Sequence, residues 1–196
     1  MTYTPPPTLQ EALDRLPRGL MAHVERVVAE ARRLARVYGL DEERVTLAAW
    51  GHDIARGMTE PELLAGAAAA GLATSAVERS QPILLHGPLG AVLLASRHGV
   101  TDAEVLAAAR HHTTAREGMS LLEKVIFVAD KIEPGKVRQH PALSRVRELA
   151  ESDLDAALEE YLSWQLHRAA DKGWPLHPDA VAARNALILA RDLPPA

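Results

Sequence analysis

Histidine and aspartate residues interrupt apolar or small-residue segments at five places in this sequence. The segments are MAHVERV, WGHDIA, LLHGPLG, ARHHTT and IFVADKIE, and the residues are His23, His52, Asp53, His86, His111, His112 and Asp130. An ionised carboxylate in apolar surroundings is costly unless it is paired with a cation or bound to a metal. Imidazole nitrogens with carboxylate oxygens suit Fe, Mn or Zn, and a site with open positions suits catalysis. These residue types therefore indicate a catalytic metal centre.

Each of these residues, taken alone, also has a purely structural explanation. A single histidine such as His23 or His86 is most often a hydrogen-bonded residue of a helix interface, and Asp130 can pair with Lys131 or Arg138. Four further histidines lie in polar or loop-like sequence and are predicted to be surface residues: His98, His140, His167 and His177. Only the joint occurrence of the other histidines and aspartates favours a metal centre.

The adjacent pair His52 and Asp53 needs a particular backbone position. Neighbouring residues inside a helix do not share a face. At a helix terminus, where the backbone leaves helical geometry, both side chains can point toward one metal. We therefore expect this pair at a helix end, with a histidine from an earlier helix and an aspartate from a later one completing the ligands.

The elements that must position these residues are predicted to be helices. Apolar residues recur at spacings of three and four from Leu20 to Tyr38, and Gly39 is typical of a C-cap. Further helices are expected from Asp41 to the His52–Asp53 pair, after Thr59, over 86–98, after Thr101, from Ser120 to Pro134, and over about 152–171 and 178–192. With seven to nine helices and no convincing strand or repeat, the fold class is all-α, an irregular helical bundle.

We expect one domain with a short N-terminal extension. Residues 1–19 are predicted to form an extended segment, proline-rich over 1–8, followed by a short lead-in helix. Residues 20–196 would form the helical domain, with the C-terminal helices packed on it. The apolar face of the penultimate helix can pack on the domain or on a second subunit of a homodimer; its residues are Leu154, Leu158, Leu162, Trp164 and Leu166.

The composition excludes several classes of protein. Hydrophobic residues make up 47% and charged residues 24%, as in ordinary globular domains. The absence of cysteine excludes disulfides and thiolate metal sites. A net charge of −4 argues against a general nucleic-acid-binding surface. The start MTYTPPPTLQ does not read as a secretory signal, and no apolar run is long enough for a membrane span, so we expect a cytoplasmic protein without nucleic-acid or membrane partners.

The order of these motifs resembles that of a known family. H…HD…D in an all-helical chain resembles the HD-domain metal-dependent phosphohydrolase superfamily. The strings LLHGPLGA, RHHTT followed by GMS, and LLEKVIFVADKIEPGK closely resemble its YqeK branch. The resemblance covers about residues 20–160. The HD dipeptide alone is a weak signal, but the ordered set of strings is specific.

The resemblance implies roles for individual residues. His23, His52, Asp53 and Asp130 match the metal ligands, and Asp53 would also bridge two metals and orient the attacking water. His86 and His112 match additional histidines around the same centre, where they would bind a second metal or act as phosphate donors or general acid. His111 would lie next to these ligands without binding the metal itself. The metal would most often be iron, as one or two ions, with Mn, Zn or Mg as alternatives.

The resemblance also implies an activity. YqeK-like proteins are symmetrical bis(5′-nucleosyl)-tetraphosphatases, which hydrolyse diadenosine tetraphosphate to two ADP with a metal-activated water. The partner would therefore be a small dinucleoside polyphosphate. The chain departs from the family pattern at Arg56, usually Lys, at Ala115, usually Gly, and at Lys136, usually Arg. These departures put nucleotide preference and rate in question more than the reaction type.

Basic and hydroxyl side chains near the motifs are the predicted substrate contacts. Arg56, Lys136 and Arg138 would hold the phosphates, with Arg116 as a further phosphate ligand, or else these residues form a solvated basic face. The hydroxyls of Thr113 and Thr114 can donate to phosphate or stabilise a local turn. Trp50 can stack on a base or pack in the core.

Three other functions remain open at this point. A different HD-type enzyme acting on nucleoside monophosphates or deoxynucleotides would share the core ligands, but not the LLHG, HHTT and ADKIEPG strings. A non-catalytic regulatory module that binds metal or nucleotide would lack one of the metal-ligating residues. A structural helical interaction protein would bind no metal.

Overall fold

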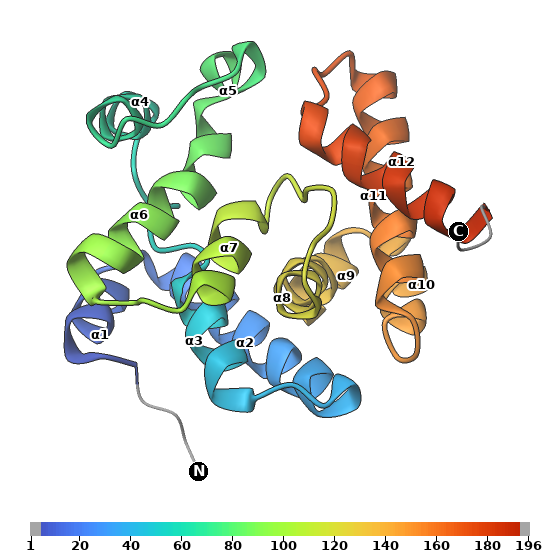
Figure 1. Ribbon diagram of the computed structural model, residues 1–196, viewed down its shortest axis with the longest axis horizontal. Coiled ribbons are helices and arrows are strands. Elements are labelled where there is room, and N and C mark those ends of the chain that lie inside the picture. Colours follow the sequence, from blue (N-terminus) through green and yellow to red (C-terminus); the bar gives the residue numbers. More distant parts are fainter. Residues whose placement is uncertain (1–4, 193–196) are drawn as a thin grey trace.

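The computed structural model describes residues 5–192, which form α-helices and no β-strand (Figure 1). The elements are α1 (Pro7–Leu13), α2 (Arg18–Tyr38), α3 (Glu42–Gly51), α4 (Glu60–Ala69), α5 (Ala76–Ser80), the 3-10 helix η1 (Pro82–Leu85), α6 (His86–His98), α7 (Ala103–His111), α8 (Leu121–Ile132), α9 (Pro134–Gln139), α10 (Leu143–Leu149), α11 (Leu154–Lys172) and α12 (Pro178–Asp192). The all-α prediction is confirmed. Among the described helices, none has the length and apolarity to cross a membrane.

The predicted number of helices was too low. The described part of the chain has α1 to α12, whereas seven to nine were expected. The additional elements are short: α5, α9 and α10 have 5, 6 and 7 residues. Helices of this length are too short to show a periodic apolar pattern. The Pro134–Gly135 stop ends α8 as predicted, but Pro134 also begins α9, because proline suits the first turn of a helix.

The N-terminal extension is helical earlier than predicted. α1 begins at Pro7, inside the segment 1–8 that was expected to be extended, because proline is favoured at the first helical position. Leu9 and Leu13 of α1 are completely buried. Residues 1–4 of that segment lie outside the described residues.

Side-chain caps fix the starts of the helices that lead to the predicted site. Asp41 and Asp102 accept hydrogen bonds from the first backbone N–H groups of α3 and α7. Ser120 and Glu123 form a capping box at the start of α8. Gly39 ends α2 with a φ of 66°, the left-handed conformation that turns the chain into α3.

Helix α8 is the centre of the core. It packs against α2, α3, α7, α10 and α11, and Figure 1 shows it surrounded by them. Its residues from Val125 to Ile132 are all buried, and Phe127 is the largest of the fully buried side chains. An aspartate on this helix, Asp130, is therefore held deep in the molecule.

The C-terminal helices pack on the rest of the described chain. α11 packs against α8 and α10, and α12 packs against α11. Leu154, Leu158 and Leu162 of α11 are buried within this chain. Trp164 and Leu166 of the same face are half-buried.

Candidate metal centre

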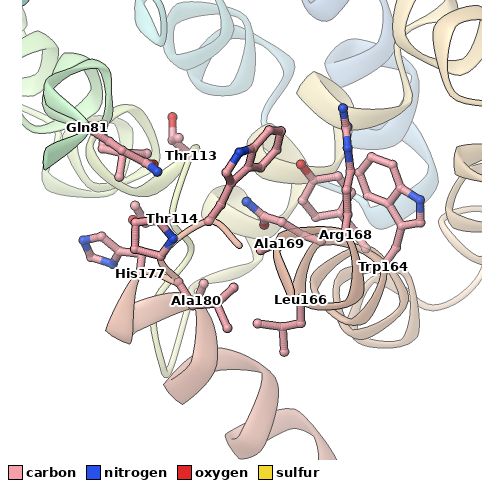
Figure 2. Close-up of a pocket in the computed structure, with 15 residues that line it drawn as sticks. Gln81, Thr113, Thr114, Trp164, Leu166, Arg168, Ala169, His177 and Ala180 are labelled. Atoms are coloured by element: carbon pink, nitrogen blue, oxygen red, sulfur yellow. The ribbon is translucent and has the colours of Figure 1, made fainter. Parts of the chain in front are cut away.

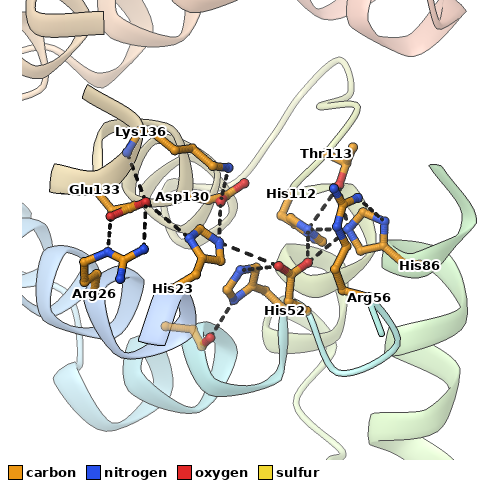
Figure 3. A network of polar contacts seen from close by, with 12 residues as sticks. His23, Arg26, His52, Arg56, His86, His112, Thr113, Asp130, Glu133 and Lys136 are labelled. Carbon is orange, nitrogen blue, oxygen red and sulfur yellow. Dashed lines mark hydrogen bonds and ion pairs between the residues drawn. The ribbon is translucent and has the colours of Figure 1, made fainter. Parts of the chain in front are cut away.

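The six predicted metal ligands lie together, although they come from five segments of the chain (Figure 3). They are His23 of α2, His52 and Asp53 at the end of α3, His86 at the start of α6, His112 directly after α7, and Asp130 of α8. All are buried except His23, whose side chain is 13% exposed. The expectation that the His–Asp pair stands at a helix end is confirmed.

Three of the histidines are oriented by the same contact. The Nδ1–H groups of His52 and His112 donate to the carbonyls of Ala49 and Ala109 at 2.7 and 2.8 Å. His86 donates in the same way to the carbonyl of Ile83. A histidine that donates from Nδ1 presents the lone pair of Nε2, the form that binds metals. The buried Nε2 of His52 has no hydrogen-bond partner among residues 5–192.

Asp53 lies between two pairs of histidines. Its Oδ1 is 3.1 and 3.3 Å from Nε2 of His86 and His112. Its Oδ2 is 3.6 and 3.5 Å from Nε2 of His23 and His52. The two oxygens of one carboxylate thus face different ligand groups.

The distances among the donor atoms define the same arrangement. Potential ligand atoms of His23, His52 and Asp130 lie within 4.8 Å of one another, as do those of His52, Asp53 and His112. The Nε2 atoms of His86 and His112 are 2.9 Å apart. Because both rings donate from Nδ1, two lone pairs face each other there.

Asp130 is paired with two lysines as well as with a histidine. Its Oδ1 is 3.1 Å from His23 Nε2 and 2.7 Å from Lys136 Nζ, and its Oδ2 is 2.6 Å from Lys131 Nζ. Burial opposes ionisation of this carboxyl, but the two ammonium groups hold its pKa well below the usual value. Asp130 therefore forms the ion pair with Lys131 that was considered as an alternative to a ligand role, and it also lies in the histidine–aspartate cluster.

Burial keeps the central imidazoles neutral. It lowers the pKa of His112 to about 4, although Asp53 opposes this shift, and it lowers the pKa of His52 in the same direction. Burial would also raise the pKa of Asp53, but the surrounding His52, His112 and His86 lower it well below its usual value. The cluster thus offers neutral nitrogens and ionised carboxylates, which is the donor set that a divalent cation requires.

Glu133 and Arg26 support His23 from behind, and the sequence reasoning did not identify them. Glu133 Oε1 is 3.4 Å from His23 Nδ1, and Glu133 Oε2 accepts a hydrogen bond from Arg26 Nε at 2.5 Å. Glu133 also caps α9. Glu133 precedes Pro134, so its position before a helix start was the only signal in the sequence.

The cluster opens into a cavity of about 320 Å³ that also contains three of the predicted substrate contacts. Arg56, Thr113 and Lys136 line it together with the histidines. The hydroxyl of Thr113 is 3.1 and 3.0 Å from Nε2 of His86 and His112. Arg56 Nη1 lies 3.4 Å from His86 Nδ1 in a weak contact, because that nitrogen already donates to a carbonyl.

The other predicted substrate contacts lie elsewhere. Arg116 donates to both carboxylate oxygens of the buried Glu123, at 2.8 and 2.6 Å, and is outside this cavity. Arg138 is exposed on α9 and does not line it either. The hydroxyl of Thr114 donates to the carbonyl of Ala115, the local-turn alternative. Trp50 packs against the core and does not line the cavity.

Two further residues, Ala115 and His177, have an unexpected backbone conformation and an unexpected burial, respectively. Ala115, where the resemblance leads one to expect glycine, has a φ of 58°, in the left-handed region that favours glycine. His177 was predicted to be a surface residue, but its side chain is only 11% exposed and lies 3.7 Å from Glu78 Oε1. His177 directly precedes α12, and its Nδ1 lies 3.8 Å from Oδ2 of Asp179 in the first turn of that helix.

Comparisons with known proteins agree with this geometry. A family model described as HD domain matches residues 20–135. The symmetrical bis(5′-nucleosyl)-tetraphosphatase of Halalkalibacterium halodurans is 38% identical over 172 residues, covering 85% of this chain and 88% of that protein. The protein of the same name from Bacillus subtilis is 37% identical over 166 residues, with the same shares covered.

A solved structure is also similar over nearly the whole chain. It is a crystal structure described as a predicted HD superfamily hydrolase involved in NAD metabolism from Clostridium acetobutylicum. It matches with a TM-score of 0.88 and 33% sequence identity, covering 93% of this chain and 96% of that one.

Proposed function

The chain belongs to the HD domain family, and from this premise we propose that it hydrolyses diadenosine tetraphosphate symmetrically to two ADP. The curated relatives that bear the name of this activity match most of the chain. The observation that carries the proposal is Asp53, whose two oxygens face two separate pairs of histidines in an open cavity.

The donor atoms fit one or two divalent cations. His23, His52, Asp130 and Oδ2 of Asp53 would hold one ion. His86, His112 and Oδ1 of Asp53 would hold a second. Such ions would supply the partner that the buried His52 Nε2 lacks and would separate the facing lone pairs of His86 and His112. Iron suits this mixture of imidazole and carboxylate donors, and Mn, Zn and Mg are the alternatives.

The side chains divide the work of phosphoanhydride hydrolysis. A divalent metal held by these residues would lower the pKa of a bound water and polarise the phosphoryl oxygen. Asp53 is placed to accept a hydrogen bond from the attacking water and so to orient it. Thr113 donates from its hydroxyl at the same wall of the cavity. If only one metal binds, His86 and His112 would donate to the phosphate only after gaining a proton on Nε2, because Nδ1–H of each already donates to a carbonyl.

The positions of two basic side chains suit symmetrical cleavage of the substrate. Lys136 and Arg56 both line the cavity and lie on different sides of the network in Figure 3, Lys136 beside Asp130 and Arg56 beside His86. A substrate whose central bridge lies over Asp53 would therefore have a cationic side chain on each side of the cleaved bond. Each of these two side chains would bind the phosphates of one ADP half.

The test combines metal analysis with a product assay. The protein is purified without chelator, Fe, Mn and Zn are quantified by elemental mass spectrometry, and the products from diadenosine tetraphosphate are separated by chromatography. We expect bound metal and ADP as sole product, both lost in Asp53→Ala. The matched control is Asp171→Ala, an exposed carboxylate on α11, which should keep both.

Other outcomes would replace the proposal. Bound metal without ADP formation would favour another nucleotide substrate or a regulatory role. Absence of metal and of turnover, even with added Fe(II) or Mn(II) under reducing conditions, would favour a structural helical protein.

A further inference from the structure

A second cavity lies next to the metal centre, against the C-terminal helices (Figure 2). Its volume is about 160 Å³. The lining includes Tyr161, Trp164, Gln165 and Arg168 from α11, Trp174 from the loop after α11, and Thr113. Of the residues that line this cavity, only Thr113 and Thr114 were predicted to contact substrate.

The two cavities meet at Thr113, which lines both. The hydroxyl of Thr113 is 3.0 Å from His112 Nε2 on the side of the metal centre. Lys131 makes a second connection, since its Nζ pairs with Asp130 and lies 5.6 Å from the centre of the Tyr161 ring. A molecule that reached from the metal centre into the second cavity would pass Thr113.

We propose that this second cavity binds the base of one nucleotide half of the substrate. Trp174 would stack on the base, and the amide of Gln165 would bind its polar edge. This inference rests on the proposed function for the phosphate part of the substrate, because it places one end of a nucleotide beside the cavity.

Aromatic and guanidinium groups gather here in the way that nucleobases require. Trp174 is 51% exposed, although it is a large apolar side chain beside a cavity. The Arg168 guanidinium carbon lies 5.3 and 5.6 Å from the ring centres of Trp164 and Trp174. Single bases stack on aromatic rings and on arginine planes, largely independently of base identity.

Gln165 supplies a hydrogen-bonding group that is unsatisfied within residues 5–192. Its Oε1 is buried and has no hydrogen-bond partner there. An unpaired buried acceptor is unfavourable, so a ligand that donates to it gains affinity. A glutamine amide can bind both the amino group and N7 of adenine. The residue thus gives the cavity a group that can recognise the edge of a base.

The sizes of the cavities support this division of the nucleotide. A cavity of roughly 150 Å³ holds a benzene ring. At about 160 Å³ the second cavity accommodates a planar ring, and a partly exposed rim at Trp174 allows a purine to extend outward. The phosphates would remain in the cavity of about 320 Å³, where Lys136 and Arg56 lie.

The experiment measures binding of ADP to the full-length, metal-loaded protein by isothermal titration calorimetry. A second probe, methylenediphosphonate, carries two phosphorus groups but no base. In Trp174→Ala and in Gln165→Leu we expect ADP affinity to fall on the order of tenfold, with methylenediphosphonate affinity unchanged. Trp174→Phe keeps an aromatic ring and should keep most of the ADP affinity.

The matched control is Leu189→Ala, which shortens another exposed apolar side chain, 55% exposed on α12 and outside the cavity. It should bind both probes as the unmodified protein does. Unchanged ADP affinity in both Trp174→Ala and Gln165→Leu would overturn the inference, as would equal losses for the two probes or no ADP binding by the unmodified protein.

The binding and cleavage results separate the two proposals. ADP binding that depends on Trp174, without cleavage of diadenosine tetraphosphate, would overturn the proposed function but keep the base cavity. Cleavage with ADP affinity unaffected by these variants would keep the proposed function and place the base elsewhere.

Discussion

The three histidines His52, His86 and His112 each follow the last residue of a helix or 3-10 turn, at its C-cap. The last carbonyls of a helix have no backbone partner. The Nδ1–H of each histidine donates to a carbonyl three residues earlier in the chain, and the carbonyl of Ile83 also accepts from the backbone N–H of His86. One short-range contact therefore completes the helix end and turns Nε2 into the site.

Ala115 is the residue at which the local backbone is least favourable for its side chain. It has a φ of 58° and is completely buried in the turn that follows His112. Conformations of this kind cost about 1 to 3 kcal/mol for a residue other than glycine, and more for a branched one. The surrounding packing must hold this turn in place.

We expect Ala115→Val to lower the free energy of unfolding by about 2 kcal/mol or more, because valine is strained at this φ and its methyls meet a filled core. The free energy of unfolding of Ala115→Gly should stay within about 1 kcal/mol of that of the unmodified protein. Glycine adopts this φ without strain, and this gain offsets the loss of a buried methyl group. Urea unfolding measures both. Equal stability of the two variants would contradict this account of the turn.

At the scale of elements, the crossing of α6 and α7 sets the distance between His86 and His112. Gly87 of α6 lies at this crossing, and a Cβ atom there would be 2.7 Å from the backbone oxygen of Arg110 and 3.1 Å from that of Ala109. Backbone atoms cannot move aside as a flexible side chain can. The absence of a side chain at Gly87 therefore allows the two helices to approach.

Gly87→Ala should push α6 away from α7, reduce the free energy of unfolding by about 1 to 3 kcal/mol, and lower the metal content of the purified protein. Chemical unfolding and elemental analysis check the two effects. Gly19→Ala serves as the control for stability, because no atom lies within 4 Å of its added Cβ. It should be neutral or stabilising by up to about 1 kcal/mol. A Gly87 variant that behaves like the Gly19 variant would be evidence against a tight crossing.

The turn between α7 and α8 is held by the buried carboxylate of Glu123. Burial alone would raise its pKa, but His111, Arg116 and the backbone of Ser120 lower it from 4.5 to about 2. A pKa that is lower in the folded than in the unfolded state stabilises the protein above the unfolded value. This contribution is lost as the pH falls from about 4.5 toward 2.

Glu123→Gln should therefore reduce stability at pH 7 by about 2 to 3 kcal/mol and reduce the loss of stability between pH 4.5 and 2. Unfolding curves recorded across this pH range provide the measurement. Glu117→Gln, at an exposed neighbouring position, should follow the unmodified protein. If the pH profiles of Glu123→Gln and the unmodified protein coincide, Glu123 does not contribute in this way.

At the scale of the whole molecule, the proposed metal ligands join segments that are far apart in sequence. His23 precedes Asp130 by more than a hundred residues, and their side chains are 3.1 Å apart. A cation bound here would bind the folded chain much more tightly than the unfolded chain. Metal binding should therefore stabilise the entire bundle.

We expect removal of the metal by a chelator to lower the melting temperature, and saturation at about 100 times Kd to raise it by roughly 5 to 10 °C. Differential scanning calorimetry with and without Fe(II) or Mn(II) measures the shift. Asp53→Ala should show no such shift. The same melting temperature with and without metal in the unmodified protein would exclude a bound cation at this position.

The sequence by itself determined the features that depend on short-range interactions. The helix starts at Asp41 and Ser120, and the helix end at His52–Asp53, were predicted because each involves residues two to four positions apart. The all-α fold class follows from the same periodic patterns. The ordered motifs also identified the histidines and aspartates that the structure brings together.

Only the tertiary structure decided which side chains share a cavity. Arg116 and Thr113 are neighbours in sequence, yet Arg116 pairs with Glu123 while Thr113 lies at the metal centre. Glu133, directly after α8, reaches His23 because α8 packs against α2. Trp174 reaches the cavity beyond Thr113 because α11 packs against α8. Such contacts between distant segments depend on how helices pack in the core, and no local pattern in the sequence records that packing.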